Sequence, residues 1–320
     1  MRIAFHSEQL GLRGTEIALF DYAYYNREIL YNGSLIISDR NSPNLQTLSR
    51  FEEHFPVVLY DDFSEVSRIV EREKVDSVYY MKSGQYDGKV VPNAQNLIHA
   101  VFQFHQPHGE RHAYISQWLA NKMGGEGYPH VPYMVDILKH QHQRDFRGKM
   151  LIPNTDLVFG YMGGRDSFNI EFAQKAVAKA VEQRDDLHFI LLNVDAFVEH
   201  PRVHFFNGTA DMEAKIAFIN TCDACIHARD GGESFGLTVA EFSSFNKPIV
   251  TTDWCSGGLN DLAHLEMLGD KAIIYHSYDE LLSIFLGIDR RADIEGKDWA
   301  AYSQYNPTAV MKQFEKVFLL

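Results

Sequence analysis

The sequence contains little cysteine, with only Cys222, Cys225 and Cys255 among its 320 residues. An odd and small number of cysteines cannot build a disulfide framework, and it is typical of a chain kept in a reducing compartment. Cys222 and Cys225 form a C-x-x-C pair, but no second pair accompanies them. We therefore interpret them as two buried thiols rather than as a zinc or redox site.

Positive charge and long apolar runs are also scarce. The chain has 30 Lys and Arg against 43 Asp and Glu, which gives a formal net charge of −13. This balance argues against broad nucleic-acid binding, because phosphate backbones attract dense Lys/Arg patches. No apolar run approaches the roughly 18 residues of a membrane-spanning helix, and the first residues lack a signal-peptide profile. We therefore expect a cytoplasmic protein with no transmembrane segment.

What the sequence does contain is the composition of an ordinary globular protein, with 45% apolar and 23% charged residues. A chain of 320 residues exceeds the usual size of a single core, so we expect two domains of about 150 residues each. Each half is long enough to bury a core of its own.

Short β-rich runs alternate with helical patterns along the first half, and the same rhythm restarts near residue 151. This alternation is typical of parallel sheets with crossover helices. We predict an α/β protein with two Rossmann-like, doubly wound domains, residues 1–150 and 151–300, although G-x-G-x-x-G is missing. Residues 123–150 lack a clean period and are predicted to connect the domains. Two such domains in tandem would face a cleft at the carboxyl ends of their strands.

The stretch RDGGESFGLTVAEF, residues 229–242, combines a glycine turn with two acids. Gly231 and Gly232 permit a tight turn after a strand, and the amides of residues 234–238 then lack partners at the start of a helix, where a phosphate binds well. Glu233 would project before the first turn. Glu241 suits the two hydroxyls of a ribose, because carboxylate oxygens accept hydrogen bonds.

A plain structural interpretation of these acids also exists. Glu233 would then be a favourable charge at a helix N-terminus, and Glu241 would be a solvated side chain. The coincidence of the glycine turn, the preceding strand and the spacing favours the other interpretation. An acid for a hydroxylated ligand, amides for a diphosphate and an acid for ribose together describe a nucleotide sugar.

The segment ESFGLTVAE resembles the motif E-x-F-G-[LI]-x-x-x-E of retaining glycosyltransferases of the GT-B fold, family 4. The flanking segments, HFFNGTADMEAKIAFINTCDACIHAR and FNKPIVTT, are similar to those around that motif. The resemblance is strong over residues 154–255. It implies the GT-B fold, and it implies that residues 301–320 pack back on the first domain. It also implies a donor-binding set, which we carry over as Gly232, Glu233, Ser234, Phe235, Gly236, Leu237, Thr238 and Glu241.

The family usually supplies an Arg and a Lys after the first strand of the second domain, to stabilise negative charge on the leaving diphosphate. Here Tyr161 occupies the expected Arg position, Arg165 is displaced, and no Lys occurs before Lys175. Either Arg165 or Arg229 is expected to serve the diphosphate. Arg165 as an ordinary surface residue is the alternative.

In the first half, the segment GLRGTEIALFDYA resembles the family's glycine-rich loop, with Gly14 in place. A strand-to-helix turn capped by Thr15 is the plain alternative. The family also has a histidine near the sugar, and His105 and His108 are the candidates. No D-x-D, the metal clamp of the other glycosyltransferase fold, occurs in the chain. We therefore expect no metal and no cofactor.

Together these features predict a retaining, metal-independent glycosyltransferase that moves a hexose or related sugar from a nucleoside-diphosphate sugar to a glycan or other hydroxyl acceptor. A UDP- or GDP-sugar is the expected donor. Two alternatives stay open: a glycosyltransferase-like subunit that binds sugar or a partner without turnover, and a nucleotide-sugar epimerase of the same fold. The missing Lys favours the first alternative, whereas the intact pair of Glu233 and Glu241 opposes it.

Overall fold

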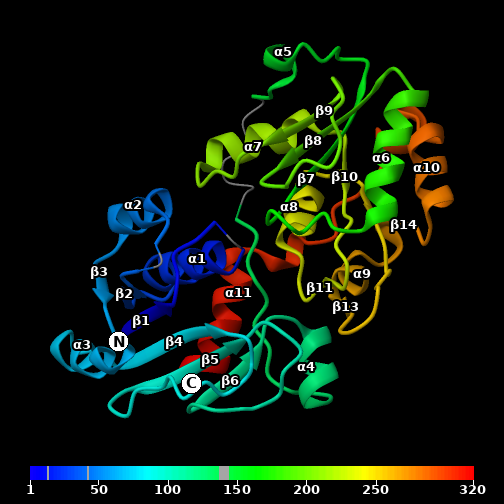
Figure 1. Ribbon diagram of the computed structural model, residues 1–320. Helices are drawn as coiled ribbons and strands as arrows, with labels where there is room; N and C mark the ends of the chain where they lie inside the picture. The colour runs from blue at the N-terminus through cyan, green and yellow to red at the C-terminus, as the bar shows by residue number, and fades with distance from the viewer. Residues whose placement is uncertain (13, 42, 137–143) are drawn as a thin grey trace. The chain divides into compact units, whose positions relative to one another are not determined.

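The computed structural model describes residues 1–12, 14–41, 43–136 and 144–320. The chain forms two compact units (Figure 1). Unit 1 comprises Met1–Met134 together with Gln304–Leu320, and unit 2 comprises Val135–Ser303. Each unit contains one six-stranded sheet in which every pairing is parallel, so the α/β class with two doubly wound domains is confirmed.

The sheet of unit 1 has the strand order β3-β2-β1-β4-β5-β6. Its inner strands are apolar and buried on both faces, as parallel strands covered by helices are. The strands are β1 (Arg2–Ser7), β2 (Gly33–Asp39), β3 (Val57–Tyr60), β4 (Ser77–Lys82), β5 (Gln95–Ala100) and β6 (Arg111–Tyr114). The covering helices are α1 (Gly14–Glu28), α2 (Leu45–His54), α3 (Val66–Arg72) and α4 (Gln117–Gly124), with the short η1 (Phe63–Glu65) before α3.

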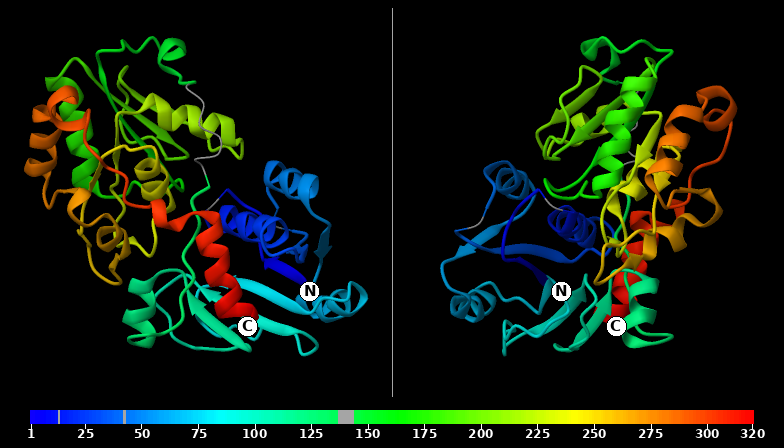
Figure 2. Two further views of the ribbon diagram at one scale, coloured as in Figure 1. Left: turned by 180° about the vertical axis from the view of Figure 1, so that it is seen from behind. Right: turned by 45° about the vertical axis from the view of Figure 1, so that its right-hand side comes forward.

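The last residues of the chain complete the core of unit 1. Helix α11 (Pro307–Phe314) begins after Asn306, whose side chain accepts a hydrogen bond from the Ala309 amide, and it continues into η6 (Glu315–Leu319). The rings of Phe314 and Phe318 are fully buried, and the centroid of the Phe314 ring lies 5.4 Å from that of Tyr22 on α1. Figure 2 shows this segment in red along the sheet of unit 1 from two further directions.

The sheet of unit 2 has the order β14-β12-β10-β7-β8-β9, and a two-stranded ladder of β11 and β13 stands apart from it. The strands are β7 (Leu157–Met162), β8 (Leu187–Leu192), β9 (Val203–Phe206), β10 (Ala224–Ile226), β11 (Gly232–Glu233), β12 (Ile249–Thr251), β13 (Asp261–Leu262) and β14 (Ala272–Ile274). The helices are α5 (Arg147–Met150), α6 (Glu171–Gln183), α7 (Met212–Thr221), α8 (Leu237–Ser244), α9 (Ala263–Leu268) and α10 (Tyr278–Gly287).

Strand order in unit 2 reverses between β7 and β10. From β7 the chain adds β8 and β9 on one side, and from β10 it adds β12 and β14 on the other. In doubly wound sheets, ligands bind outside the carboxyl ends of the strands at this reversal. The loops after β7 and after β10 are therefore the positions in unit 2 where a site is expected.

The two units divide the chain at Met134/Val135 and at Ser303/Gln304, whereas the sequence suggested boundaries at 150 and 300. Residues 137–143 of the predicted connection lie outside the described residues. Residues 144–150 belong to unit 2 because Arg147 is buried there. Its guanidinium donates to the carbonyls of Thr221, Pro153 and Asp156.

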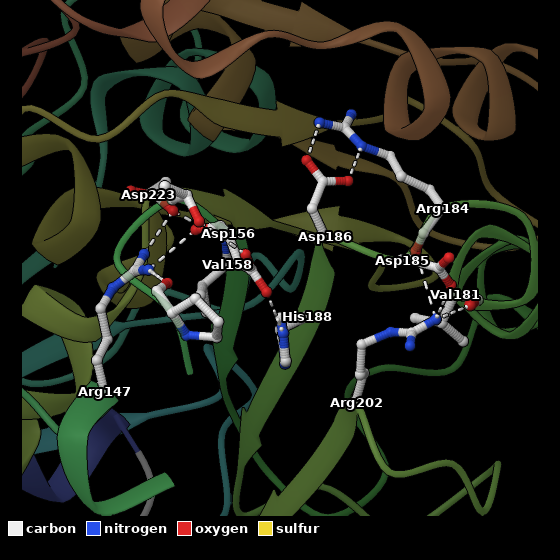
Figure 3. A network of polar contacts seen from close by, with 12 residues as sticks. Arg147, Asp156, Val158, Val181, Arg184, Asp185, Asp186, His188, Arg202 and Asp223 are labelled. Carbon is white, nitrogen blue, oxygen red and sulfur yellow. Dashed lines mark hydrogen bonds and ion pairs between the residues drawn. The ribbon is translucent and has the colours of Figure 1, made fainter. Parts of the chain in front are cut away.

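Arg147 also forms an ion pair with Asp223, at 2.6 Å between Nη2 and Oδ2. The Asp223 carboxylate accepts from the Val158 amide at 2.8 Å and lies 3.1 Å from Arg290 Nε. Figure 3 shows this network at the amino ends of β7, β8 and β10, which is the end of the sheet opposite the predicted site. The network stabilises the fold of unit 2.

Within the described ranges, no helix has the length and apolarity needed to cross a bilayer.

Replacing Arg147 with Met should destabilise unit 2, because Asp223 would keep a buried charge with only the half-exposed Arg290 beside it. We expect the free energy of unfolding to fall by about 3–5 kcal/mol. Urea unfolding followed by tryptophan fluorescence measures this. The matched control is Arg165→Met, since the Arg165 side chain is 75% exposed and pairs only loosely with Asp195. That change should cost at most about 1 kcal/mol, and equal losses in both variants would contradict the assignment.

Candidate active site

The loops after β7 and β10 are joined to each other at the strand-order reversal of unit 2. The Asp230 amide donates to Asn169 Oδ1 at 2.7 Å, and the Asn169 amide donates to the Ala228 carbonyl at 3.1 Å. Asp230 in turn accepts from the Ser256 amide at 2.9 Å. Three loops at the carboxyl edge of the sheet are therefore held as one surface.

The predicted glycine turn is present and has little room for any other residue. Gly231 and Gly232 have φ values of +79° and +68°. Gly232 pairs with Asp261 in the ladder of β11 and β13, and a Cβ atom on Gly232 would lie 2.0 Å from the Asp261 carbonyl oxygen. Glycines without Cβ atoms were expected to let another group approach the backbone here, and that group is the Asp261 carbonyl. Its approach fixes the position of Glu233, the next residue.

Each carboxylate oxygen of Glu233 lies near a nitrogen of a neighbouring side chain, and one of the two contacts is a hydrogen bond. Arg229 Nη1 donates to Oε2 at 2.9 Å, and His227 Nε2 lies 3.5 Å from Oε1. The Glu233 side chain is only 17% exposed. Burial by itself would raise the pKa of Glu233, but the Arg229 guanidinium and the His227 imidazole outweigh it and lower that pKa to about 2. Glu233 therefore stays ionised at neutral pH while it faces the loop surface.

Two buried histidines stand behind Glu233. His227 Nδ1 lies 2.9 Å from Thr251 Oγ1, and His264 Nε2 lies 3.1 Å from the same oxygen. The two imidazole centroids are 4.8 Å apart. All three side chains are fully buried, and burial lowers the pKa of His264 to about 3. His264 is therefore neutral at physiological pH.

Helix α8 starts at this surface with Gly236 as its N-cap, in the left-handed region at φ +83°. Within the part of the chain that the structure describes, no side chain caps this helix start. Its first amides thus have the environment that the sequence predicted for a phosphate. Leu237 and Ser234 are only partly buried and lie at the helix start.

The side chains of Phe235 and Thr238 make structural contacts that hold the turn in place, so they are not available to a ligand. Phe235 is buried against the Tyr302 ring, with centroids 5.6 Å apart. Thr238 Oγ1 donates to the Met162 carbonyl at 2.6 Å and so ties α8 to the end of β7. A donor-binding role for these two residues, which stays a prediction, would therefore act through their backbone amides.

Glu241 is buried and paired rather than solvated. Its Oε1 accepts from the ammonium of Lys215 on α7, and the side chains of Glu241 and Lys215 are 8% and 12% exposed. The sequence indicated a carboxylate available to ribose, and it did not identify Lys215 as its partner. One carboxylate oxygen of Glu241 is therefore already engaged by a cation.

The two candidate arginines have different positions. Arg229 forms an ion pair with Glu233 at the site, and its side chain is 41% exposed. Arg165 lies in the loop after β7, is 75% exposed, and is 3.5 Å from Asp195. Tyr161, at the position where the family has Arg, is buried with its ring centroid 6.1 Å from that of His227. The geometry brings Arg229, and not Arg165, to Glu233.

The remaining predicted residues belong to unit 1. Gly14 is the first residue of α1. His105 Nδ1 lies 2.9 Å from the Tyr114 hydroxyl, which itself donates to the Phe104 carbonyl, so His105 is the donor in that contact. His108 Nδ1 donates to the Gln106 carbonyl at 2.7 Å. Their proposed roles toward a sugar stay predictions.

Sequence reasoning missed Lys215, His227, Thr251 and His264. His227 follows β10 and Thr251 ends β12. A polar residue next to such a buried apolar run could have been read as a candidate site residue. Lys215 directly precedes the apolar run Ile216–Ile219 of α7, a sign that its ammonium would be partly buried. His264 carries no local signal, because only the β11–β13 ladder brings α9 to the site.

Metal-ligating groups do not converge in the described ranges: no set of three or more His, Cys, Asp or Glu side chains there is arranged to hold an ion. Cys222 and Cys225 are free and buried, as the sequence indicated, and burial raises the pKa of both thiols.

The ion pair of Glu233 predicts a pH dependence of stability. The folded-state pKa of Glu233 is about 2, below the ordinary glutamate pKa of 4.5. Its stabilising contribution is therefore complete above pH 4.5 and is lost as the pH falls toward 2. It amounts to about 3 kcal/mol at most, less where solvent screens Arg229. Urea unfolding of the wild type and Glu233→Gln between pH 6 and pH 3 should show a stability difference that shrinks with acid, and a constant difference would contradict the pairing.

No protein-family model matches the chain, and no curated protein does. Solved structures do match over its whole length. HepE from Anabaena, in complex with UDP and glucose, is 15% identical, with 99% of this chain and 98% of that chain covered and a TM-score of 0.74. A glycosyltransferase from Rickettsia africae is 13% identical, with 99% and 97% covered and a TM-score of 0.69. A Listeria monocytogenes protein assigned as a UDP-N-acetylglucosamine 2-epimerase is 10% identical, with 98% and 96% covered and a TM-score of 0.61. The structural neighbours of this chain thus include glycosyltransferases, and the chain has the GT-B fold.

Proposed function

We propose that the chain is a retaining, metal-independent glycosyltransferase that moves a hexose or related sugar from a UDP- or GDP-sugar to a glycan or other hydroxyl acceptor. One observation carries the proposal. A buried, ionised carboxylate, Glu233, lies between Arg229 and His227 at the strand-order reversal, beside the uncapped start of α8. The fold shared with HepE, which was crystallised with UDP and glucose, supports a nucleotide sugar as the ligand of such a surface.

Each group in this proposal has a chemical role. Glu233 accepts hydrogen bonds from sugar hydroxyls, and its charge favours the positive character that the sugar ring gains as the bond to the diphosphate breaks. Arg229 and the first amides of α8 stabilise the negative charge on the leaving diphosphate. Arg229 has donors to spare, because a guanidinium carries five N–H groups and Glu233 engages one of them.

Glu241 and Lys215 form the ribose end of the proposed site. With Oε1 engaged by Lys215, the free Oε2 of Glu241 accepts from one ribose hydroxyl, while the ammonium has further N–H groups for another ribose oxygen. The pair thus offers both an acceptor and donors, which suits a diol better than a carboxylate alone. Gly14 is proposed to bring backbone amides to the donor diphosphate, and one of His105 and His108 is proposed to face the donor sugar.

The donor site is tested by titrating purified protein with UDP, GDP, ADP and their glucose derivatives in the presence of EDTA. Glu233→Gln should abolish sugar release, by at least about a hundredfold, and leave the affinity for the free nucleoside diphosphate nearly unchanged. Arg229→Met should weaken binding of the diphosphate. The matched control is Glu182→Gln, whose 59% exposed side chain pairs only with Lys179. Calorimetry gives the affinities, and NMR of the released sugar gives the anomeric configuration.

The outcomes separate the alternatives. Release that stops in EDTA and returns with Mg²⁺ would contradict metal independence, and inversion at the anomeric carbon would contradict retention. Conversion of the nucleotide sugar to an epimer would establish the epimerase. Binding without release, with any hydroxyl acceptor supplied, would favour the non-catalytic subunit. No binding of any nucleotide would overturn the assignment of the site.

The ribose end is tested by a double-mutant cycle. Lys215→Met leaves the Glu241 charge buried and unpaired, so it should destabilise unit 2 by about 3–5 kcal/mol. The double variant Lys215→Met, Glu241→Gln removes that charge and should recover most of the stability. Affinity for the nucleoside diphosphate should stay low in both variants. Recovery of affinity together with stability would show that the pair is structural only.

A further inference from the structure

The Glu233 carboxylate needs a neighbouring side chain that keeps its orientation fixed when the donor binds. Arg229 is 41% exposed on the side chain, and in the proposed function it turns part of its guanidinium to the diphosphate. The other oxygen of Glu233, Oε1, faces His227, which has no exposed surface. The orientation of the carboxylate therefore depends on what fixes the His227 ring.

Strand β12 holds both the backbone and the ring of His227. Its amide donates to the Val250 carbonyl on β12, and its carbonyl accepts from the Tyr275 hydroxyl at 2.9 Å. Its Nδ1 atom is 2.9 Å from Thr251 Oγ1, at the end of β12. Thr251 Oγ1 is also 3.1 Å from His264 Nε2, on the first turn of α9. The side chains of His227, Thr251 and His264 thus form a continuous buried row, and His264 also packs against Gly232 and Gly236 of the turn that carries Glu233.

The charge of Glu233 selects the direction of these hydrogen bonds. A hydroxyl has one proton, so Thr251 can donate to only one of the two imidazoles. If Thr251 accepted from His227 Nδ1–H, a neutral His227 would turn the lone pair of Nε2 to an ionised carboxylate oxygen 3.5 Å away, which is repulsive. The favourable order has His264 Nε2–H donating to Thr251 and Thr251 donating to His227 Nδ1. The N–H of His227 Nε2 then points to Glu233.

We propose that Thr251 and His264 are positioning residues for Glu233, acting through His227 to present an N–H group to Oε1. This inference rests on the proposed function for its catalytic consequence, because only then does the orientation of Glu233 matter to a sugar. The relay keeps the carboxylate aligned from the buried side and leaves Arg229 available to the diphosphate. It identifies two further residues that determine how the donor sugar is held.

Thr251→Val tests the relay because valine keeps the shape of threonine and removes its hydroxyl. Thr252 offers a matched control: it is also buried, and its hydroxyl accepts from the Trp254 amide at 3.1 Å. We expect Thr251→Val to lower kcat for sugar release or transfer roughly tenfold to a hundredfold, with little change in the Kd for the nucleoside diphosphate. Thr251→Ser, which restores a hydroxyl, should recover most of kcat, and Thr252→Val should resemble the wild type. Equal losses of kcat in Thr251→Val and Thr252→Val would overturn the proposal.

A second readout does not depend on activity. Imidazole ¹⁵N spectra of histidine-labelled protein, assigned by substitution, report which nitrogen of His227 and His264 carries the proton. We expect a protonated Nε2 on both rings, and a change of the His227 signals in both Thr251→Val and Glu233→Gln. A bare Nε2 on His227 would overturn the relay. If the spectra show a protonated Nε2 on both rings but the wild type releases no sugar from any donor, the proposed function is wrong and the relay to Glu233 is still supported.

Discussion

A carboxylate that is largely withdrawn from water must have partners on both oxygens, and Glu233 obtains them from one flexible cation and one rigid ring. The geometry of the loop around it follows from this requirement. The chain has to leave β10 through His227, turn back over Arg229, and re-enter a strand at Gly232 so that both partners face the same carboxylate. The turn requires glycine at position 232, because the Asp261 carbonyl occupies the space that a side chain would need.

The sequence predicted the elements that carry strong local patterns. The helical patterns of the second half include α6 (Glu171–Gln183) and α7 (Met212–Thr221). The apolar periodicity of α6 is a local property, so it can be read without knowing the fold. The same holds for the glycine turn, whose positive φ values require residues without Cβ atoms.

What could not be predicted arises from contacts between residues distant in sequence. The Lys215–Glu241 pair joins two helices that only the sheet brings together, and His264 reaches the site through a ladder of two residues per strand. Arg147 is buried in unit 2 by its contacts with Thr221 and Asp223, although in sequence it looks like an ordinary surface cation in a segment without periodicity. In each case a polar side chain is buried because its partner is already there, and no local pattern records the partner.

The closure of the core of unit 1 by residues 304–320 bears on the order in which the chain folds during synthesis. Unit 2 is a continuous segment, and all of it has been made once Ser303 has left the ribosome. Unit 1 is then still without Phe314 and Phe318, whose rings fill its interior. Domains usually fold from the N-terminus onward as they emerge. Unit 1 is begun before unit 2 but cannot complete its core until residues 304–320 have been made, so its unfinished apolar surface has to be kept from aggregation until then.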